Sequence, residues 1–350
     1  MKSQKPNIRG LSNTELERFL QSIDQPSFRT LQIQQWLWQQ NIDSFNQMTN
    51  LPYALRTKLQ DHFELRNIHI YQCQFSQDQT IKFAFQLIDQ HLIESVLIPT
   101  ENRVTVCISS QVGCSLDCQF CATAQMKRIR NLYWWEIYQQ VQLLQLKSIQ
   151  YFQKPITNVV FMGMGEPLMN FNNVVKSLRL MTSDVGLNMS SQRFTVSTSG
   201  ISKLIYKLAD ECLGVNLAVS LHTANQEIRK KIMPFSSKFP LDELLDSLIY
   251  WYQKTKIKIM FEYLVLKEVN DTVEDINQLV LFCQKVPCKV NFIEYNSIEG
   301  QGFEQAETSV ISQYQKILSQ HHIHSTIRRS RGGDIDAACG QLANKWNVAV

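Results

Sequence analysis

From residue 103 onward the sequence alternates between short apolar segments and longer amphipathic segments, and no other feature limits the possible folds as much. The short segments are predicted strands at 103–110, 156–164, 193–199, 215–222, 258–266 and 289–296. Helical spacing is clear between several of them, at 133–146, 172–183, 241–254 and 272–286. Strands that alternate with helices form a parallel sheet with right-handed crossovers. The sequence therefore predicts an α/β fold, and six units indicate an incomplete (β/α)6 barrel rather than a closed barrel of eight.

The first hundred residues follow a different pattern. Up to about residue 66 the apolar spacing is helical, beginning with a capping box formed by Ser12 and Glu15. Residues 81–87 then alternate as in a strand, and 91–99 suit its hairpin partner. We therefore expect an N-terminal accessory module of helices and a small β-sheet over residues 1–99, followed by a core over residues 100–350.

Composition narrows the class of protein. With 350 residues, of which 44% are apolar and 19% charged, the chain can bury a full core. It has no apolar run of membrane-spanning length and no apolar secretory segment at its start, so we expect a cytoplasmic protein without membrane association. Nine cysteines are too few for a disulfide scaffold, and clustered cysteines then indicate metal binding or chemistry. The net charge of +4 permits a basic surface for nucleic acid without requiring one.

Four of the cysteines fall between residues 107 and 121, in "CISSQVGCSLDCQFC". Cys114, Cys118 and Cys121 form a C-x-x-x-C-x-x-C pattern directly after the first predicted strand of the barrel, while Cys107 lies seven residues upstream of Cys114. A structural zinc needs four protein ligands, and the next histidine after Cys121 is His222. Three thiolates would instead leave one iron of a four-iron cluster open for a substrate or cofactor. A zinc-stabilised RNA-binding protein without activity remains the alternative from another class.

Other polar groups are predicted at the same end of the barrel, where parallel barrels carry their chemistry. "GMGEP" follows the second strand, "STSG" ends the third, "SLH" ends the fourth and Asn296 ends the sixth. The polar residues of these motifs, and Glu94 on an earlier predicted strand, could also have purely structural roles. Ser197 and Asn296 can cap strand ends, His222 can be a core histidine, and Glu94 can be a surface carboxylate on a strand.

Together these motifs resemble the radical S-adenosylmethionine (SAM) superfamily, and within it the adenine-C2 RNA methyltransferase family. The resemblance extends over most of residues 94–343, including "CISSQVGCSLDCQFCATAQM", "FMGMGEPLMN", "TVSTSG", "SLH" and "RGGDIDAACGQLA". It implies that Cys114, Cys118 and Cys121 ligate a [4Fe-4S] cluster with SAM on its open iron. It implies further that SAM is lined by Gly165, Glu166, Ser197, Ser220, Leu221, His222 and Asn296.

The same resemblance assigns three catalytic residues. Cys339 is expected to carry a methyl group from one SAM, and a 5′-deoxyadenosyl radical from a second SAM would activate that methyl for addition to the electron-poor carbon 2 of adenine. Glu94 matches the position with a proton-accepting role. Cys107 would then attack the Cys339 sulfur and release the product, which leaves a transient Cys107–Cys339 disulfide.

The resemblance also indicates the partners. The implied substrates are an adenosine in 23S rRNA and the adenosine beside the anticodon in tRNA, the implied reductant is of the flavodoxin or ferredoxin type, and a monomer is expected. RNA contact is expected from the 1–99 module and from two basic groups beside the reactive cysteines, namely Lys127, Arg128 and Arg130, and Arg328, Arg329 and Arg331. The closest rival is the related methylase of adenine carbon 8 that confers antibiotic resistance. Pro167 after Glu166 and "RGGD" before "IDAACGQL" favour the carbon-2 branch.

Overall fold

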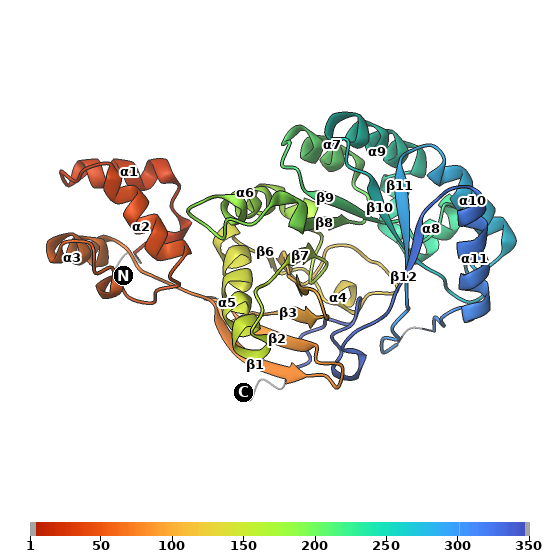
Figure 1. Ribbon diagram of the computed structural model, residues 1–350, viewed down its shortest axis with the longest axis horizontal. Coiled ribbons are helices and arrows are strands. Elements are labelled where there is room, and N and C mark those ends of the chain that lie inside the picture. Colours follow the sequence, from red (N-terminus) through yellow and green to blue (C-terminus); the bar gives the residue numbers. More distant parts are fainter. Residues whose placement is uncertain (1–4, 301, 347–350) are drawn as a thin grey trace.

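The computed structural model describes residues 5–300 and 302–346, and within them the fold is built on an open sheet with strand order β1-β2-β3-β4-β7-β8-β9-β10-β11-β12 (Figure 1). From β4 to β12 every pairing in this sheet is parallel. In the described part of the chain the end strands β1 and β12 do not pair with each other, so the sheet curves without closing. The predicted incomplete barrel is confirmed.

The strands of the large sheet are β1 (His69–Phe75), β2 (Ile81–Gln86), β3 (Leu92–Pro99), β4 (Val104–Cys107), β7 (Asn158–Phe161), β8 (Phe194–Thr198), β9 (Asn216–Ser220), β10 (Ile259–Leu264), β11 (Cys288–Ile293) and β12 (Ser325–Arg328). A separate pair consists of β5 (Gln111–Val112) and β6 (Arg130–Asn131). β12 was not predicted from the sequence, because this short segment is half-exposed and has no apolar run.

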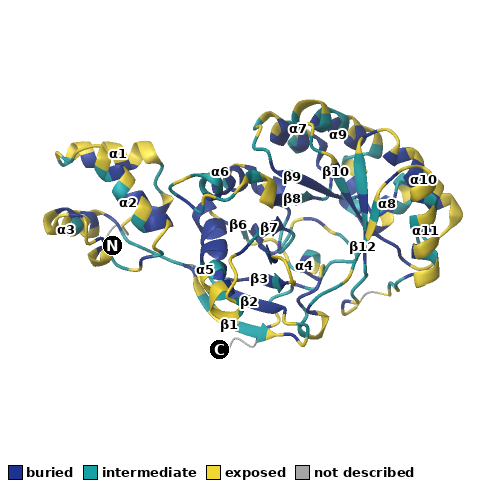
Figure 2. Cartoon of the chain, in the orientation of Figure 1, coloured by how far each residue is buried: buried dark blue, intermediate teal, exposed yellow. Residues whose placement is uncertain are grey.

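The α-helices are α1 (Asn13–Ser22), α2 (Phe28–Trp38), α3 (Tyr53–His62), α4 (Ala122–Gln125), α5 (Trp134–Phe152), α6 (Phe171–Thr182), α7 (Ser202–Asp210), α8 (Gln226–Ile232), α9 (Leu241–Thr255), α10 (Val273–Cys283) and α11 (Thr308–Gln320). Short 3-10 helices are η1 (Ile8–Gly10), η2 (Phe45–Gln47), η3 (Pro167–Asn170), η4 (Ser191–Arg193), η5 (Pro234–Lys238) and η6 (Gly333–Ile335). Figure 1 shows α6, α7, α9, α10 and α11 on the outer side of the curved sheet. Their outer faces are exposed and the strands beneath them are buried (Figure 2).

The hairpin predicted before residue 100 forms as β2 and β3, and β1 adds to its outer side. Its inner strand β3 pairs antiparallel with β4, with Val96 opposite Cys107 and Leu97 opposite Val106. The small sheet is therefore continuous with the barrel, and one hydrogen-bonded sheet crosses the expected division at residue 100.

Helices α1 to α3 form the predicted N-terminal module, and the Ser12–Glu15 capping box is present. The buried guanidinium of Arg9 holds the module together, because it donates to the carbonyl oxygens of Leu37 and Ile42. The Tyr138 hydroxyl of α5 donates to the carbonyl oxygen of Trp38 at 2.6 Å, which fixes the end of α2 to the core. Within residues 5–300 and 302–346, none of the helices has both the length and the apolar character needed to cross a membrane.

Candidate functional site

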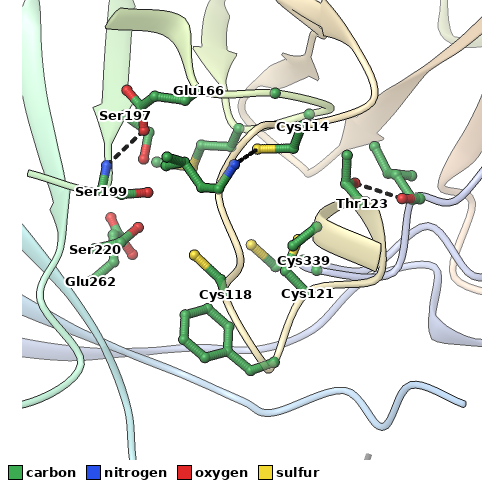
Figure 3. Close-up of a pocket in the computed structure, with 18 of the residues that line it drawn as sticks. Cys114, Cys118, Cys121, Thr123, Glu166, Ser197, Ser199, Ser220, Glu262 and Cys339 are labelled. Carbon is green, nitrogen blue, oxygen red and sulfur yellow. Dashed lines mark hydrogen bonds between the residues drawn. The ribbon is translucent and has the colours of Figure 1, made fainter. Parts of the chain in front are cut away.

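A cavity that is partly open to solvent lies at the carboxyl ends of the parallel strands. The predicted residues that line it are Cys114, Cys118, Cys121, Gly165, Glu166, Ser197, Ser220, His222, Asn296 and Cys339. Figure 3 shows the cysteines on one side of it and Glu166, Ser197, Ser199 and Ser220 on the other. Three predicted residues, Glu94, Cys107 and Leu221, are not part of the lining.

The three clustered cysteines lie on the loop between β5 and β6, which enters α4 at Cys121. Burial raises the pKa of each thiol, to about 12 for Cys114 and well above the ordinary value for Cys118, and the neighbouring thiols act on these two in the same direction. Thiolates in such a place need positive charge from a bound group, which a metal centre supplies.

The cysteines do not converge on one point. Across residues 5–300 and 302–346, no three His, Cys, Asp or Glu side chains are placed to hold a single metal ion. A cluster of several irons is larger than one ion and does not require its ligands to meet at one point. Three cysteines on one loop, all lining the same cavity, are a donor set that fits an iron–sulfur cluster.

Glu166 presents a buried carboxylate to the cavity. Its Oε2 accepts the Ser199 N–H at 2.8 Å and its Oε1 accepts the Leu168 N–H at 3.1 Å. Burial raises the pKa of this carboxyl group, and no cationic side chain among the described residues pairs with it. Gly165 beside it has φ +96°, and a Cβ there would lie 2.5 Å from the Gln111 side chain. The ammonium group of an amino-acid ligand such as the methionine part of SAM fits this carboxylate.

His222 and the residues around it close the cavity at the ends of β9 and β10. Its Nδ1 accepts the Leu264 N–H at 3.1 Å, and its ring packs edge-on against Phe120 with centroids 4.5 Å apart. Burial, with the nearby Arg229 cation, lowers the pKa of His222 to about 3, so the ring is neutral at physiological pH. Leu221 is buried and its backbone N–H donates to the Glu262 carbonyl oxygen at 3.1 Å, which places this residue under the lining.

The two reactive cysteines of the sequence analysis are neighbours, although 232 positions separate them in the chain. Burial raises the pKa of Cys107 to about 12, and the Cys339 thiol adds to this effect because of its proximity. Cys339 is exposed as a residue, but burial of its thiol raises the pKa of that group, and Asn296 Nδ2 donates to its carbonyl oxygen at 3.2 Å. All nine cysteines are free thiols in this structure. The end of β4 therefore lies near the loop after β12, and Cys339 of that loop lines the cavity.

Glu94 lies outside the cavity and is fully buried. Its Oε1 accepts the Trp346 indole N–H at 2.6 Å and is 3.6 Å from Lys82 Nζ, and its Oε2 accepts the Asn344 N–H at 3.2 Å. The segment that covers Glu94 also supplies Leu342 to the cavity wall. The carboxyl-terminal segment thus lies between Glu94 and the cavity in this structure.

Glu262, an acidic residue in the middle of the otherwise apolar strand β10, was not predicted from the sequence as a site residue. It lines the cavity and is buried, and burial raises its pKa. Its Oε1 accepts Asn291 Nδ2 at 2.9 Å, whereas its Oε2 lacks a hydrogen bond within the described chain and lies 3.7 Å from Arg328 Nη1. The sequence signal that could have identified Glu262 as a site residue is a charged residue inside an otherwise apolar strand.

The three arginines before Cys339 do not extend freely toward a phosphate backbone, contrary to the expectation from sequence. Each is held by a carboxylate of the protein, and only Arg329 has a largely exposed side chain, at 74%. The pairs are Arg328 with Glu262 at 3.7 Å, Arg329 with Glu294 at 2.7 Å and Arg331 with Asp78 at 3.1 Å. In the other basic group, Arg130 is likewise bound to Asp89 and Glu136, and Lys127 and Arg128 are exposed.

Comparison with known families agrees with this arrangement. The family described as Ribosomal RNA large subunit methyltransferase N-terminal domain matches residues 6–65, and the Radical SAM superfamily matches residues 108–282. The first range covers the helical module and the second covers the cysteine loop and most of the parallel sheet.

Several curated relatives match along nearly the whole chain. A protein of Christiangramia forsetii named "Probable dual-specificity RNA methyltransferase RlmN" is 52% identical over 345 residues, covering 99% of this chain and 98% of its own length. A Marinobacter nauticus protein named "Dual-specificity RNA methyltransferase RlmN" is 38% identical over 347 residues, covering 98% and 94%. The crystal structure of a radical SAM methyltransferase from Sphaerobacter thermophilus aligns with a TM-score of 0.90 at 35% identity, over 96% of this chain and 99% of that one.

Proposed function

Because the chain belongs to the RlmN family of radical SAM RNA methyltransferases, we propose that it methylates carbon 2 of adenosine, both in 23S rRNA and beside the anticodon of tRNA. As a radical SAM enzyme it uses a [4Fe-4S] cluster and SAM. The observation that best supports methyl transfer through Cys339 is the proximity of Cys107 and Cys339 beside the cavity of the three-cysteine loop, and carbon 2 is favoured by the likeness to the RlmN relatives.

The residues of the cavity divide into two sets. Cys114, Cys118 and Cys121 would hold the cluster, and the Glu166 carboxylate would hold the ammonium group of SAM while Ser197, Ser220, His222 and Asn296 line the rest. When bound, these groups supply a methyl group and a 5′-deoxyadenosyl radical.

Cys339 lines the cavity and would carry the methyl group, and the nearby Cys107 thiol would attack the Cys339 sulfur. In the release step the Cys107 thiolate forms a bond to the Cys339 sulfur, and the bond between that sulfur and the RNA-linked carbon breaks. The electron pair goes to that carbon, which takes a proton and becomes the methyl group of the product. The resulting disulfide must be reduced by a thiol before the next cycle.

Glu94 is proposed as the acceptor of the carbon-2 proton. Its separation from the cavity by the segment of Leu342, Asn344 and Trp346 means that this segment has to move before Glu94 can reach the base. We also propose that the module over residues 1–99 contacts RNA, that the protein acts as a cytoplasmic monomer and that a flavodoxin-type or ferredoxin-type protein reduces the cluster.

The proposed function is tested by mass mapping of RNA from cells with and without the gene. We expect 2-methyladenosine in 23S rRNA and beside the anticodon of tRNA only when the gene is present. A methyl group at carbon 8 would favour the resistance-type methylase, and RNA identical in the two strains would refute the proposal.

The exposed cations Lys127 and Arg128 are expected to contact RNA phosphates. Their replacement by glutamine should weaken RNA binding and reduce the slope of log affinity against log salt by about two, roughly one per lost contact. Arg331→Gln is the matched control, because Asp78 already holds this guanidinium. Binding titrations at several salt concentrations measure the slope. An equal reduction in the control would mean that Arg331 also faces RNA.

A further inference from the structure

The loop that carries Cys339 is anchored to the turn between β1 and β2. In this turn, residues 76–80, the Asp78 carboxylate accepts the Gly332 N–H at 2.9 Å through Oδ2. Arg331 lies against the same residue, with Nε 3.1 Å from Oδ2 and Nη2 donating to the Asp78 carbonyl oxygen at 2.8 Å. One aspartate of the turn therefore binds two successive residues of the loop.

A second aspartate makes the same kind of contact in the opposite direction. Asp334, in the loop, accepts the Ser76 hydroxyl at 2.6 Å and the Gln77 N–H at 3.1 Å. We call these reciprocal contacts between residues 76–80 and 331–336 the clasp. Burial acts to raise the pKa of Asp78, but hydrogen bonds from Thr80 and Gly332 outweigh it and lower the pKa to about 2. The clasp is therefore ionised and intact at neutral pH.

The two segments also fit closely. Gly332 has φ +69°, and a Cβ at this position would lie 2.9 Å from Thr80 Cγ2 and 2.8 Å from Ala337 Cβ. Thr80 is completely buried under the loop. Such close contact leaves the loop little freedom to shift along the turn.

From the clasp the chain returns directly to the cavity. The Ala337 N–H donates to the Gly332 carbonyl oxygen at 2.9 Å, and the Gly340 carbonyl oxygen accepts the Ala122 N–H at 2.7 Å. Cys339 lies between these two attachments. Its position beside Cys107 thus depends on the clasp at one end and on α4 at the other.

We propose that Asp78 and Asp334 are positioning residues, which hold Cys339 where its sulfur can meet first a methyl donor and then Cys107. The inference rests on the proposed function, because it assumes that Cys339 carries the methyl group. The sulfur has to face two partners in one cycle, and a displacement of about 1 Å is enough to slow such a reaction strongly. A loop released from the clasp would spend less time in either productive position.

The test compares Asp78→Ala, Asp334→Ala and the double variant with the wild-type enzyme carrying its cluster. The control is Glu211→Ala, which removes an ion pair of 2.6 Å with Arg179 on the outer helices. These quantities are measured for each protein: hydrogen exchange of the amides from 330 to 341, methyl occupancy of Cys339 in purified protein, iron content, and kcat and KM for RNA. If a double variant does not fold, Asp78→Asn and Asp334→Asn provide the same measurements.

In the double variant we expect loop exchange to rise about tenfold or more. Methyl occupancy and kcat should fall about tenfold, with KM for RNA and iron content unchanged. The asparagine variants, which keep one oxygen acceptor each, should recover part of the loss. If the wild-type protein carries the methyl group and the double variant shows unchanged hydrogen exchange and methyl occupancy, the positioning role of the clasp is refuted and the proposed function is not. A wild-type protein that never carries a methyl on Cys339 would overturn the proposed function and this role with it.

Discussion

Replacing Cys107 with alanine should leave the protein joined covalently to its RNA substrate. Cys339 can still take up the methyl group and form the bond to RNA, because it lines the cavity and Cys107 acts in the proposed scheme only after that bond has formed. Without the second sulfur nothing in the described cavity attacks that bond, since the remaining cysteines of the lining are the expected cluster ligands. Denaturing gels of Cys107→Ala protein from cells should show a slow band that nuclease treatment removes.

Two controls make this result specific. The double variant lacking both Cys107 and Cys339 should show no band, because no sulfur is left to carry RNA. Cys283→Ala should behave as wild type, since Cys283 is equally buried but lies on α10 next to Cys288 and away from the lining. A Cys107→Ala protein that is free of RNA and turns over normally would contradict the assigned chemistry.

The pH dependence of product release follows from the pKa of the Cys107 thiol. Burial raises the pKa of Cys107 to about 12, so its reactive thiolate is a small fraction at neutral pH. Where release limits turnover, its rate should rise about tenfold per pH unit below that pKa. Single-turnover release between pH 7 and 9 measures this slope. A flat profile would indicate that another step or another thiol controls release.

Replacing Cys118 with alanine should abolish both the bound iron and the methylation of RNA. The Cys118 thiol lies in the centre of the loop, and burial strongly disfavours its thiolate unless a positively charged centre is bound there. With two thiolates left, the cluster would lose one of its three protein ligands. Iron and sulfide analysis of protein purified without oxygen, together with its visible absorbance, measures the loss.

The matched control for the cluster is Cys212→Ala. Cys212 is an exposed free thiol at the end of α7, so its removal should leave the iron content and activity unchanged. Cys118→Ala protein with full iron content and normal activity would refute the ligand assignment. Zinc in place of iron in the wild-type protein would refute the cluster itself.

The parallel core was predictable from sequence because each buried strand is a distinct apolar run between amphipathic helices. β7 and β9 are such runs, and their ends carry the "GMGEP" and "SLH" motifs to one edge. β12 lacks this signal, since its burial depends on pairing with β11 on one side only. Periodicity cannot reveal a strand whose stability comes from its neighbour.

The candidate site was likewise predictable only where its signal is local in the sequence. The short-range patterns around Cys114, Cys118 and Cys121 could be read directly, whereas the pairing of Arg331 with Asp78 joins residues 253 positions apart. An arginine-rich segment has the same sequence whether its charges face solvent or carboxylates of the protein. The covering of Glu94 by Trp346 is equally invisible, because nothing in either segment records the contact.

The pairing of β3 with β4 also determines where the enzyme can be divided into separately folding pieces. A fragment beginning at residue 100 would leave β4 as an open edge, with its unpaired N–H and C=O groups beside Cys107 free to recruit strands from other molecules. A cut at 63–68, between α3 and β1, would leave the whole ten-stranded sheet of the described chain in one piece. Exchange of the helical module between relatives is therefore best attempted at that junction, where chimaeras keep every strand contact of the catalytic core.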